Sequence, residues 1–341
     1  MRNYFVIAAC CAGQVWATGS APPPVQLPEA PAAASLRMNM AEPTYSEGSG
    51  QLALFTGVNT LRQKLGVGLL AQDAALDTAA QAHAVYLSAH SVAQHDQTAD
   101  SQYFYEATPL LRAQKAGVGD SQWVAEVVGA ARGPNDREIG LGCVDQWYHT
   151  VYHLQSLVTN QESIGIGYSS TGALGLNHCV LDFGTSTARQ PSPTPNGVPY
   201  GGGQQIDADT FITVPADGDI GVQGGFNFAG ESPNPAPDLA TPGRPLMVYA
   251  NGAHAEVLSV TAFKLVASMA ARVLVSPAAK ADGSNGVADE YLRNNAAFLL
   301  PLAPLADLET YTASFSGTRA GKPVSISWTF STAAQAALAF R

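Results

Sequence analysis

The sequence predicts two domains of different class, a layered α/β domain over residues 49–185 and an all-β domain over residues 205–332. Apolar residues recur at helical spacing before residue 160, and two strand-like runs follow them. After a segment rich in Pro and Gly, residues 186–204, the chain breaks into short runs of β-branched and aromatic residues. A chain of 341 residues has room for two domains of ordinary size.

The first twenty residues have the order of an export signal. Arg2 precedes a short apolar run at residues 4–9, and small residues follow it. The tetrad IAAC, which ends at Cys10, resembles a bacterial lipobox and implies lipidation of Cys10 and membrane attachment through that lipid. Cleavage near Ala17 is the alternative. We therefore expect an exported protein, anchored in the periplasm or at the outer membrane, or freely secreted.

Residues 21–48 are rich in Pro and Ala and show no periodicity, which is typical of a flexible or polyproline-like spacer. Such a spacer suits a protein held away from a membrane or a cell wall. No later segment is expected to span a membrane, because the most apolar one, residues 258–274, contains Lys264 and Arg272.

Helices and strands of the first domain follow from apolar spacing. Two helices are predicted within residues 50–95, the first stopping at Gly66 and the second starting at an N-cap near Asp73. A short helical piece is predicted near residues 109–116 and a further helix over residues 136–158. Residues 96–122 are otherwise polar and irregular. The strand-like runs are residues 163–168 and 177–183. Helices that flank a few strands predict a layered α/β domain.

Six strands are predicted in the second domain, at residues 211–214, 246–249, 257–266, 272–275, 310–316 and 324–330. Turn residues separate them, which is typical of an all-β sandwich. Tyr311 lies where a tyrosine corner would form, and the stretch from Ser316 to Thr332 resembles the closing hairpin of bacterial immunoglobulin-like domains. We expect an immunoglobulin-like sandwich with a structural or adhesive role, followed by a tail at residues 333–341.

The net charge of −10 and the absence of a basic stripe argue against a stable complex with nucleic acid. A metal-dependent nuclease stays open, because such an enzyme need not be basic overall. Beyond the leader, the cysteines are Cys143 and Cys179. In an exported chain this pair predicts a disulfide, and a two-cysteine metal site is the alternative.

Six of the seven histidines fall in the first domain, and histidine is the usual metal ligand and general base near neutral pH. His149 and His153 are four apart on one helical face, but the H-E-x-x-H motif of zinc proteases is absent because Thr150 stands where it needs Glu. We interpret His83 as structural, and we expect His90 and His149 to be solvated.

Several short motifs occur in a fixed order between residues 50 and 185. They are Phe55-x-x-x-Asn59-x-x-Arg62, Leu70-x-x-Asp73-x-x-Leu76, Ala80-x-x-His83-Ala84, His95, Pro109-x-x-Arg112-x-x-x-Ala116-Gly117, Glu126, Trp147 with His153, Ile164-Gly165-Ile166-Gly167-Tyr168 and Asp182-Phe183-Gly184. This ordered set resembles bacterial members of the CAP superfamily, the cysteine-rich secretory protein, antigen 5 and pathogenesis-related 1 group. The resemblance implies an α–β–α sandwich with a central cleft.

In that family, two histidines and one or two glutamates face one another and can hold zinc or another divalent cation. Carried over by position, the set implied here is His95, Glu126, His153 and His178. The match is incomplete, because Val127 follows the glutamate where the family usually has Asn, and Thr150 replaces the second glutamate. Neutral imidazoles and a carboxylate suit Zn²⁺ with an open position for a water, which could become a hydroxide nucleophile.

Three functions follow as hypotheses. The first is binding of a small ligand, lipid, peptide or cell-wall fragment in the cleft or an adjacent apolar groove. The second is metal-assisted hydrolysis, as a peptidase or nuclease, with His95, Glu126 and His153 as catalytic residues. The third is a structural or adhesive surface protein. The departures at Val127 and Thr150 favour binding without catalysis.

Overall fold

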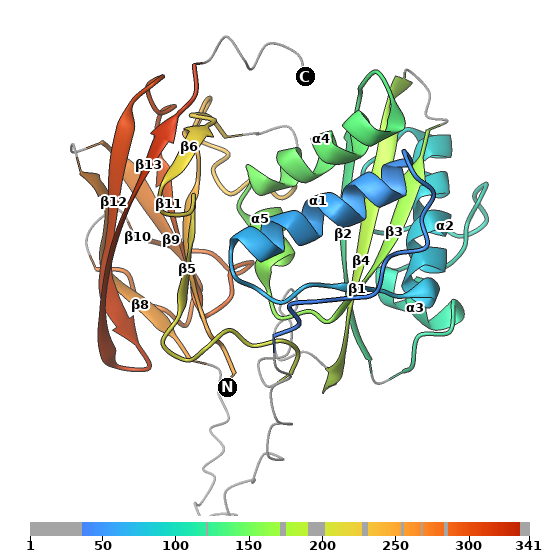
Figure 1. Cartoon of the computed structure of the whole chain (residues 1–341), viewed down its shortest axis with the longest axis horizontal. Coiled ribbons are helices and arrows are strands. Elements are labelled where there is room, and N and C mark those ends of the chain that lie inside the picture. The colour runs from blue at the N-terminus through green and yellow to red at the C-terminus, as the bar shows by residue number, and fades with distance from the viewer. Residues whose placement is uncertain are drawn as a thin grey trace, which may run out of the picture.

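The computed structural model describes residues 36–120, 122–170, 175–189, 202–226, 231–253, 256–266, 269–282 and 286–334. The predicted export signal with Cys10, the spacer up to residue 35, linker residues 190–201, His254 and tail residues 335–341 lie outside the described residues. Within the described ranges, no helix combines the length and apolar character that a membrane crossing requires. A part built of helices and strands lies beside a part built of strands (Figure 1).

The first part, called the α/β domain, has one four-stranded sheet in the order β1-β3-β4-β2. Its strands are β1 (Ala71–Gln72), β2 (Gln122–Ala131), β3 (Ser163–Ser169) and β4 (Asn177–Arg189). Its helices are α1 (Gly50–Lys64), α2 (Ala74–His90), α3 (Pro109–Lys115), α4 (Asp136–Tyr148) and α5 (Tyr152–Val158). Helices α1, α4 and α5 cover one face and α2 and α3 the other, so the predicted α–β–α sandwich is confirmed (Figure 1).

Side-chain caps explain where four of these helices begin. Asp73 accepts hydrogen bonds from the backbone N–H groups of Ala75 and Leu76, which confirms the predicted N-cap of α2. Ser49, Thr108 and Asn135 cap α1, α3 and α4 in the same way. Each cap sets the residue at which its helix begins. The helix start in turn determines which of its apolar residues face the sheet.

The single helix predicted over residues 136–158 is wrong, because α4 ends at Tyr148 and α5 begins at Tyr152. Two side chains of the segment between these helices donate hydrogen bonds to backbone carbonyls of α4. The ring of His149 donates from Nδ1 to the carbonyl of Asp145 at 2.5 Å, and the hydroxyl of Thr150 donates to the carbonyl of Trp147 at 2.8 Å. The chain therefore turns at this point instead of continuing the helix.

The second part, called the β domain, has two sheets, in the orders β10-β9-β11-β7-β5 and β6-β13-β12-β8. The strands are β5 (Phe211–Val214), β6 (Asp219–Val222), β7 (Leu246–Ala250), β8 (Leu258–Val266), β9 (Ala271–Val275), β10 (Gly286–Ala288), β11 (Ala296–Pro301), β12 (Thr310–Arg319) and β13 (Lys322–Thr332). All six predicted strands are present, while β6, β10 and β11 are not predicted from the sequence.

The two sheets of the β domain share one apolar cluster, which includes Val248 of β7, Phe263 of β8 and Trp328 of β13. The hydroxyl of Tyr311 accepts a hydrogen bond from the backbone N–H of Ala306 at 2.8 Å. This is the predicted tyrosine-corner arrangement, in which a tyrosine hydroxyl bonds to backbone a few residues upstream. The immunoglobulin-like identity of these sheets stays a prediction.

The two domains are joined through packing as well as through the chain. One apolar cluster contains Val151, the N-cap residue of α5, and Leu154 of α5 together with Val214 and Phe298 of the β domain. The side chain of Gln204 donates to the carbonyls of Leu69 at 3.0 Å and Gln161 at 2.8 Å. The end of the linker is thereby fixed to the α/β domain.

The predicted disulfide between Cys143 and Cys179 is present. It joins α4 to β4, so it links one covering helix to a central strand of the sheet. Both cysteines are fully buried. The bond therefore fixes the helical layer that carries one wall of the groove described next.

Candidate functional site

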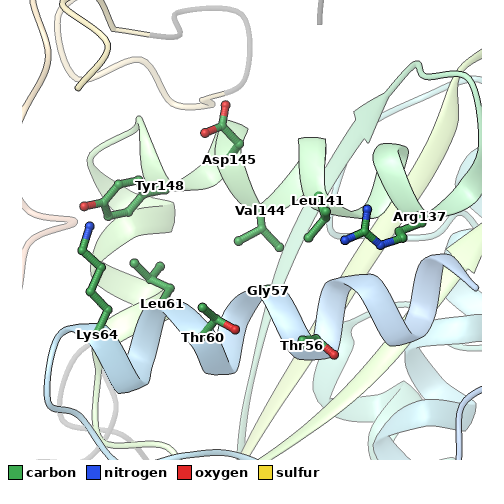
Figure 2. A pocket seen from close by; sticks show the side chains of 10 residues that line it. All are labelled: Thr56, Gly57, Thr60, Leu61, Lys64, Arg137, Leu141, Val144, Asp145 and Tyr148. Carbon is green, nitrogen blue, oxygen red and sulfur yellow. The ribbon is translucent and has the colours of Figure 1, made fainter. Parts of the chain in front are cut away.

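A shallow groove lies between α1 and α4, with a volume of about 410 Å³. We call it the α1–α4 groove. Its floor is apolar, and its lining includes Gly57 and Leu61 from α1 and Leu141 and Val144 from α4 (Figure 2). A Cβ at Gly57 would lie 3.2 Å from Val144, so glycine lets the helices approach closely here. The basic side chains of Lys64 and Arg137 stand at opposite ends (Figure 2).

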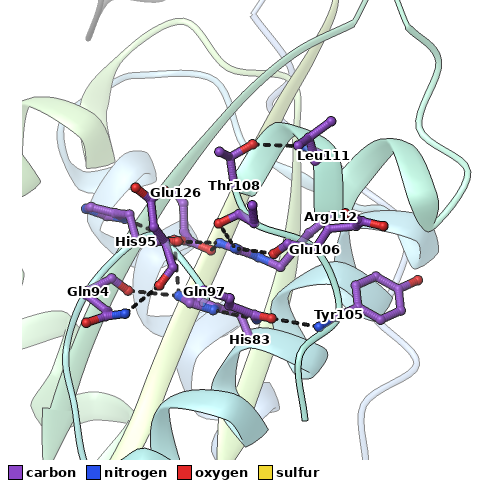
Figure 3. Close-up of polar contacts among 12 residues, drawn as sticks. His83, Gln94, His95, Gln97, Tyr105, Glu106, Thr108, Leu111, Arg112 and Glu126 are labelled. Carbon is purple, nitrogen blue, oxygen red and sulfur yellow. Dashed lines mark hydrogen bonds and ion pairs between the residues drawn. The ribbon is translucent and has the colours of Figure 1, made fainter. Parts of the chain in front are cut away.

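On the other side of the sheet, Glu126 is the centre of a charged cluster. It lies on the edge strand β2, and its side chain is fully buried. One carboxylate oxygen, Oε1, is 2.9 Å from Nδ1 of His95, and the other, Oε2, accepts from Nη2 of Arg112 at 2.7 Å (Figure 3). These residues and His83, whose Nε2 is 3.5 Å from Oε1, form what we call the His95 cluster.

Arg112 holds the loop that carries His95. Its side chain is fully buried on α3 and donates to the carbonyl of His95 at 2.9 Å, as well as to Glu126. Burial alone would raise the pKa of the Glu126 carboxyl, but the nearby His83, His95 and Arg112 outweigh it and lower that pKa. Glu126 is therefore ionised at neutral pH, and the guanidinium balances its charge.

His83 has a structural role, as the sequence predicts. Gln97 must present its amide nitrogen to Nδ1 of His83 at 2.9 Å, because its oxygen already accepts from the backbone N–H of Tyr105. Nε2 of His83 therefore carries the proton and donates to the carbonyl of Gln94 at 2.9 Å. Burial lowers the pKa of His83, so this neutral ring fixes the loop without a free nitrogen.

His95 is the accessible member of the cluster, since 47% of its side chain is exposed. Burial would lower the pKa of its ring, but the hydrogen bond to Glu126 and the charge of that carboxylate raise it. Its Nδ1 is held by Glu126, and no hydrogen bond of Nε2 occurs within the described residues. The arrangement fixes the orientation of the ring.

His153 lies on α5 and is mostly buried. Its Nδ1 is 3.4 Å from the hydroxyl of Thr150 and 3.5 Å from a carboxylate oxygen of Glu231, a residue of the β domain. Burial, followed by the charge of His95, lowers the pKa of His153 to about 3. His153 is therefore neutral at pH 7, and no hydrogen bond or ion pair joins it to His95 among the described residues.

His178 is not brought to the His95 cluster. It is a buried residue of β4, paired with Ala130 of β2 and next to Cys179. Glu126 instead pairs with Asp182, four residues further along β4, which corresponds to roughly 13 Å of strand. His149, expected to be solvated, is buried, because its ring turns back onto α4.

Among the described residues, no three His, Cys, Asp or Glu side chains are placed to hold a metal ion. The donor set explains this. Arg112 occupies one oxygen of Glu126 and brings a positive charge, while His95 occupies the other. In this arrangement the residues do not fit a divalent cation, and zinc binding stays a prediction from the family resemblance.

Asp182 and Glu231 are two further residues of interest that the sequence does not single out as site residues. Asp182 is fully buried opposite Glu126, and no donor group of the described residues hydrogen-bonds to its carboxyl oxygens. Burial and then the charge of Glu126 raise its pKa well above the usual value. An aspartate inside an apolar strand run was the available signal. For Glu231, which acts across the domain interface, the sequence offers none.

Comparison with known proteins gives one family. Residues 55–183 match the family described as CAP, the cysteine-rich secretory protein family. Curated proteins give no match. Similar solved structures include an outer surface protein from Borrelia burgdorferi, at 20% identity over 40% of this chain and 91% of that chain, with a TM-score of 0.33. Another is an extracellular protein containing an SCP domain from Bacillus anthracis str. Ames, at 19% identity over 42% of this chain and 44% of that chain, with a TM-score of 0.32.

Proposed function

Because residues 55–183 form a CAP domain of the cysteine-rich secretory protein family, we propose that this protein binds an amphipathic ligand with an apolar chain outside the cytoplasm. The α1–α4 groove is the observation that carries the proposal. Its volume of about 410 Å³ falls in the range of small-molecule sites, and its floor is apolar. The disulfide between Cys143 and Cys179 supports an oxidising compartment, as does the predicted export signal.

The charges at the groove ends indicate which way the ligand lies. Lys64 is paired with Asp219 of the β domain at 2.8 Å, and that carboxylate is nearly buried. Arg137 is 62% exposed and is paired at 2.9 Å with its exposed neighbour Glu138. Exposed pairs of this kind contribute little, about 0–1 kcal/mol, so an anionic ligand easily displaces Glu138. We place a carboxylate head at Arg137 and the apolar chain toward Tyr148.

Palmitate is a suitable probe, measured by calorimetry on the full chain. Thr60 is exposed on the lip of the groove, and Thr60→Trp should fill it and abolish binding. The matched control is Gln63→Trp, which adds the same ring to an exposed position of α1 outside the groove lining and should bind normally. Absence of palmitate binding by both the wild type and the control would reject the proposal.

The head-group assignment has a separate test. Arg137→Gln should raise the Kd for palmitate roughly tenfold, because one charge-assisted hydrogen bond is worth about 1.5–3 kcal/mol. The same substitution should leave the Kd for palmityl alcohol unchanged. Equal effects on both ligands would place the head group elsewhere.

Hydrolysis is the second candidate function, and one observation favours it. The carboxylate of Glu126 holds Nδ1 of His95 at 2.9 Å, an arrangement that orients an imidazole and stabilises its protonated form. His95 would then take a proton at Nε2 from a water or a substrate hydroxyl. Ester, peptide and nucleic-acid substrates should be tested with His95→Gln, beside His90→Gln as the matched histidine control. Activity that survives His95→Gln would reject this candidate.

A further inference from the structure

A carboxylate of the β domain is buried in the α/β domain. The side chain of Glu231 is fully buried, and its two oxygens accept hydrogen bonds from three consecutive backbone N–H groups. These are Val151 at 2.7 Å, Tyr152 at 2.6 Å and His153 at 3.1 Å. They open α5, whose own N-cap residue, Val151, makes no side-chain cap. The first donors of this helix are therefore satisfied from the other domain.

The same carboxylate faces the ring of His153. Oε1 of Glu231 is 3.5 Å from Nδ1 of His153, and it also accepts the backbone N–H of that residue. The backbone N–H and the ring of His153 therefore both contact the carboxylate of Glu231. His95 and His153 consequently each have a buried carboxylate beside Nδ1, Glu126 from the α/β domain and Glu231 from the β domain.

Other contacts fix the remainder of α5 to the β domain. The hydroxyl of Tyr152 donates to Asp289 at 2.8 Å. Gln155 donates to the carbonyl of Tyr291 at 3.1 Å and accepts the backbone N–H of Arg293 at 2.8 Å. The helix that carries His153 is therefore held along its length by the β domain, while the strand that carries Glu126 is held by its own sheet.

We propose that Glu231 is a positioning residue for His153, and that the β domain through this contact sets the orientation of that ring. The surroundings of the His153 ring are then complete only when the two domains are docked. This inference is independent of ligand binding in the α1–α4 groove, which lies between other helices. It gives the β domain a direct part in the candidate site, beyond the structural or adhesive role expected from the sequence.

The test uses the full chain labelled with ¹⁵N at histidine and at the backbone. Glu231→Ala should shift the ring nitrogen signals of His153, because Nδ1 of that ring loses the carboxylate oxygen that lies 3.5 Å away. Exchange of the amide protons of Val151, Tyr152 and His153 should accelerate at least tenfold. Glu309→Gln, a substitution of an exposed glutamate of the β domain, is the control and should leave both measurements unchanged.

The ring signals separate positioning from simple support. A purely structural role would accelerate amide exchange but leave the ring signals of His153 at their wild-type values, and that result would overturn the proposal. Should Glu231→Ala fail to fold, Glu231→Gln decides, since its amide oxygen still accepts backbone N–H groups. Restored amide protection with altered His153 ring signals supports the proposal, and unaltered ring signals overturn it. Palmitate binding should be equal in all these folded variants.

Discussion

Arg244 of the β domain lies over the aromatic ring of Tyr148 at the end of α4, with its guanidinium carbon 4.4 Å from the ring centre. The arginine is fully buried, and the charges of Asp145 and Asp219 act on it. A desolvated cation above an aromatic face is attracted by the ring quadrupole. The contact therefore joins the two domains at the far end of α4.

Replacing Arg244 by Ala should weaken the joined structure. We expect the free energy of unfolding to fall by about 2 kcal/mol, the value for a desolvated cation–π contact, with lost packing in addition. Arg244→Lys should recover part of this loss, because it keeps the charge but not the flat guanidinium. Urea unfolding measures both changes. The exposed Arg137→Ala is the control, and an equal loss there would contradict the assignment.

Acid should destabilise the protein through His149. Burial, followed by the charge of Arg244, lowers the pKa of His149 well below its usual value. The unfolded chain takes up a proton near pH 6.5 and the folded chain does not, so stability present above pH 6.5 is lost as the pH falls. His149→Asn keeps a donor for the Asp145 carbonyl and should lose less stability between pH 8 and 5 than the wild type. Parallel pH curves for both proteins would refute this.

Asp182 should behave as a neutral group. Its pKa is raised, so its contribution to stability is present below the ordinary aspartate pKa and is lost as the pH rises through the folded value. Asp182→Asn should therefore match the wild type near the ordinary aspartate pKa of about 3.9 and be more stable than it at pH 7, because only the aspartate must then take up a proton to fold. A protonated carboxyl band in the infrared spectrum of the wild type should disappear in this variant. A large loss of stability at pH 7 would show that Asp182 is ionised.

Zinc binding tests the family expectation against the geometry. Arg112 neutralises Glu126, so titration of the wild type should give no one-site heat of binding. Removing the guanidinium in Arg112→Met should free Oε2, and Zn²⁺ should then raise the Tm of that variant alone. One-site binding by the wild type that is lost in the double variant His95→Ala, His153→Ala would instead establish the metal site.

Local signals predicted much of the fold. The helical spacing of α1 and the Asp73 N-cap of α2 depend on neighbouring residues, so the sequence reveals them. The burial of β2 does not alternate along the strand, and β11 is buried at every position, so neither shows the period-two pattern that identifies strands. The burial pattern of these two strands depends on the elements that pack on both of their faces, which the local sequence does not reveal.

The candidate site was predictable only in part. The meeting of His95 and Glu126 follows from the family resemblance, since a separation of 31 positions along the chain gives no spacing rule. The role of Arg112 as the counter-charge depends on how α3 packs. Glu231 was beyond prediction, because its partners on α5 are about 80 residues away and belong to the other domain.

One apolar cluster runs from α5 into the five-stranded sheet of the β domain. Each domain therefore has an apolar surface on that side that is covered by the other domain. Separating the two domains would expose this apolar interface to water. A recombination event that transferred the α/β domain without the β domain would thus produce an aggregation-prone fragment with an exposed apolar surface. The two domains are therefore expected to be inherited as one unit, and substitutions on one side of the interface to be matched by substitutions on the other.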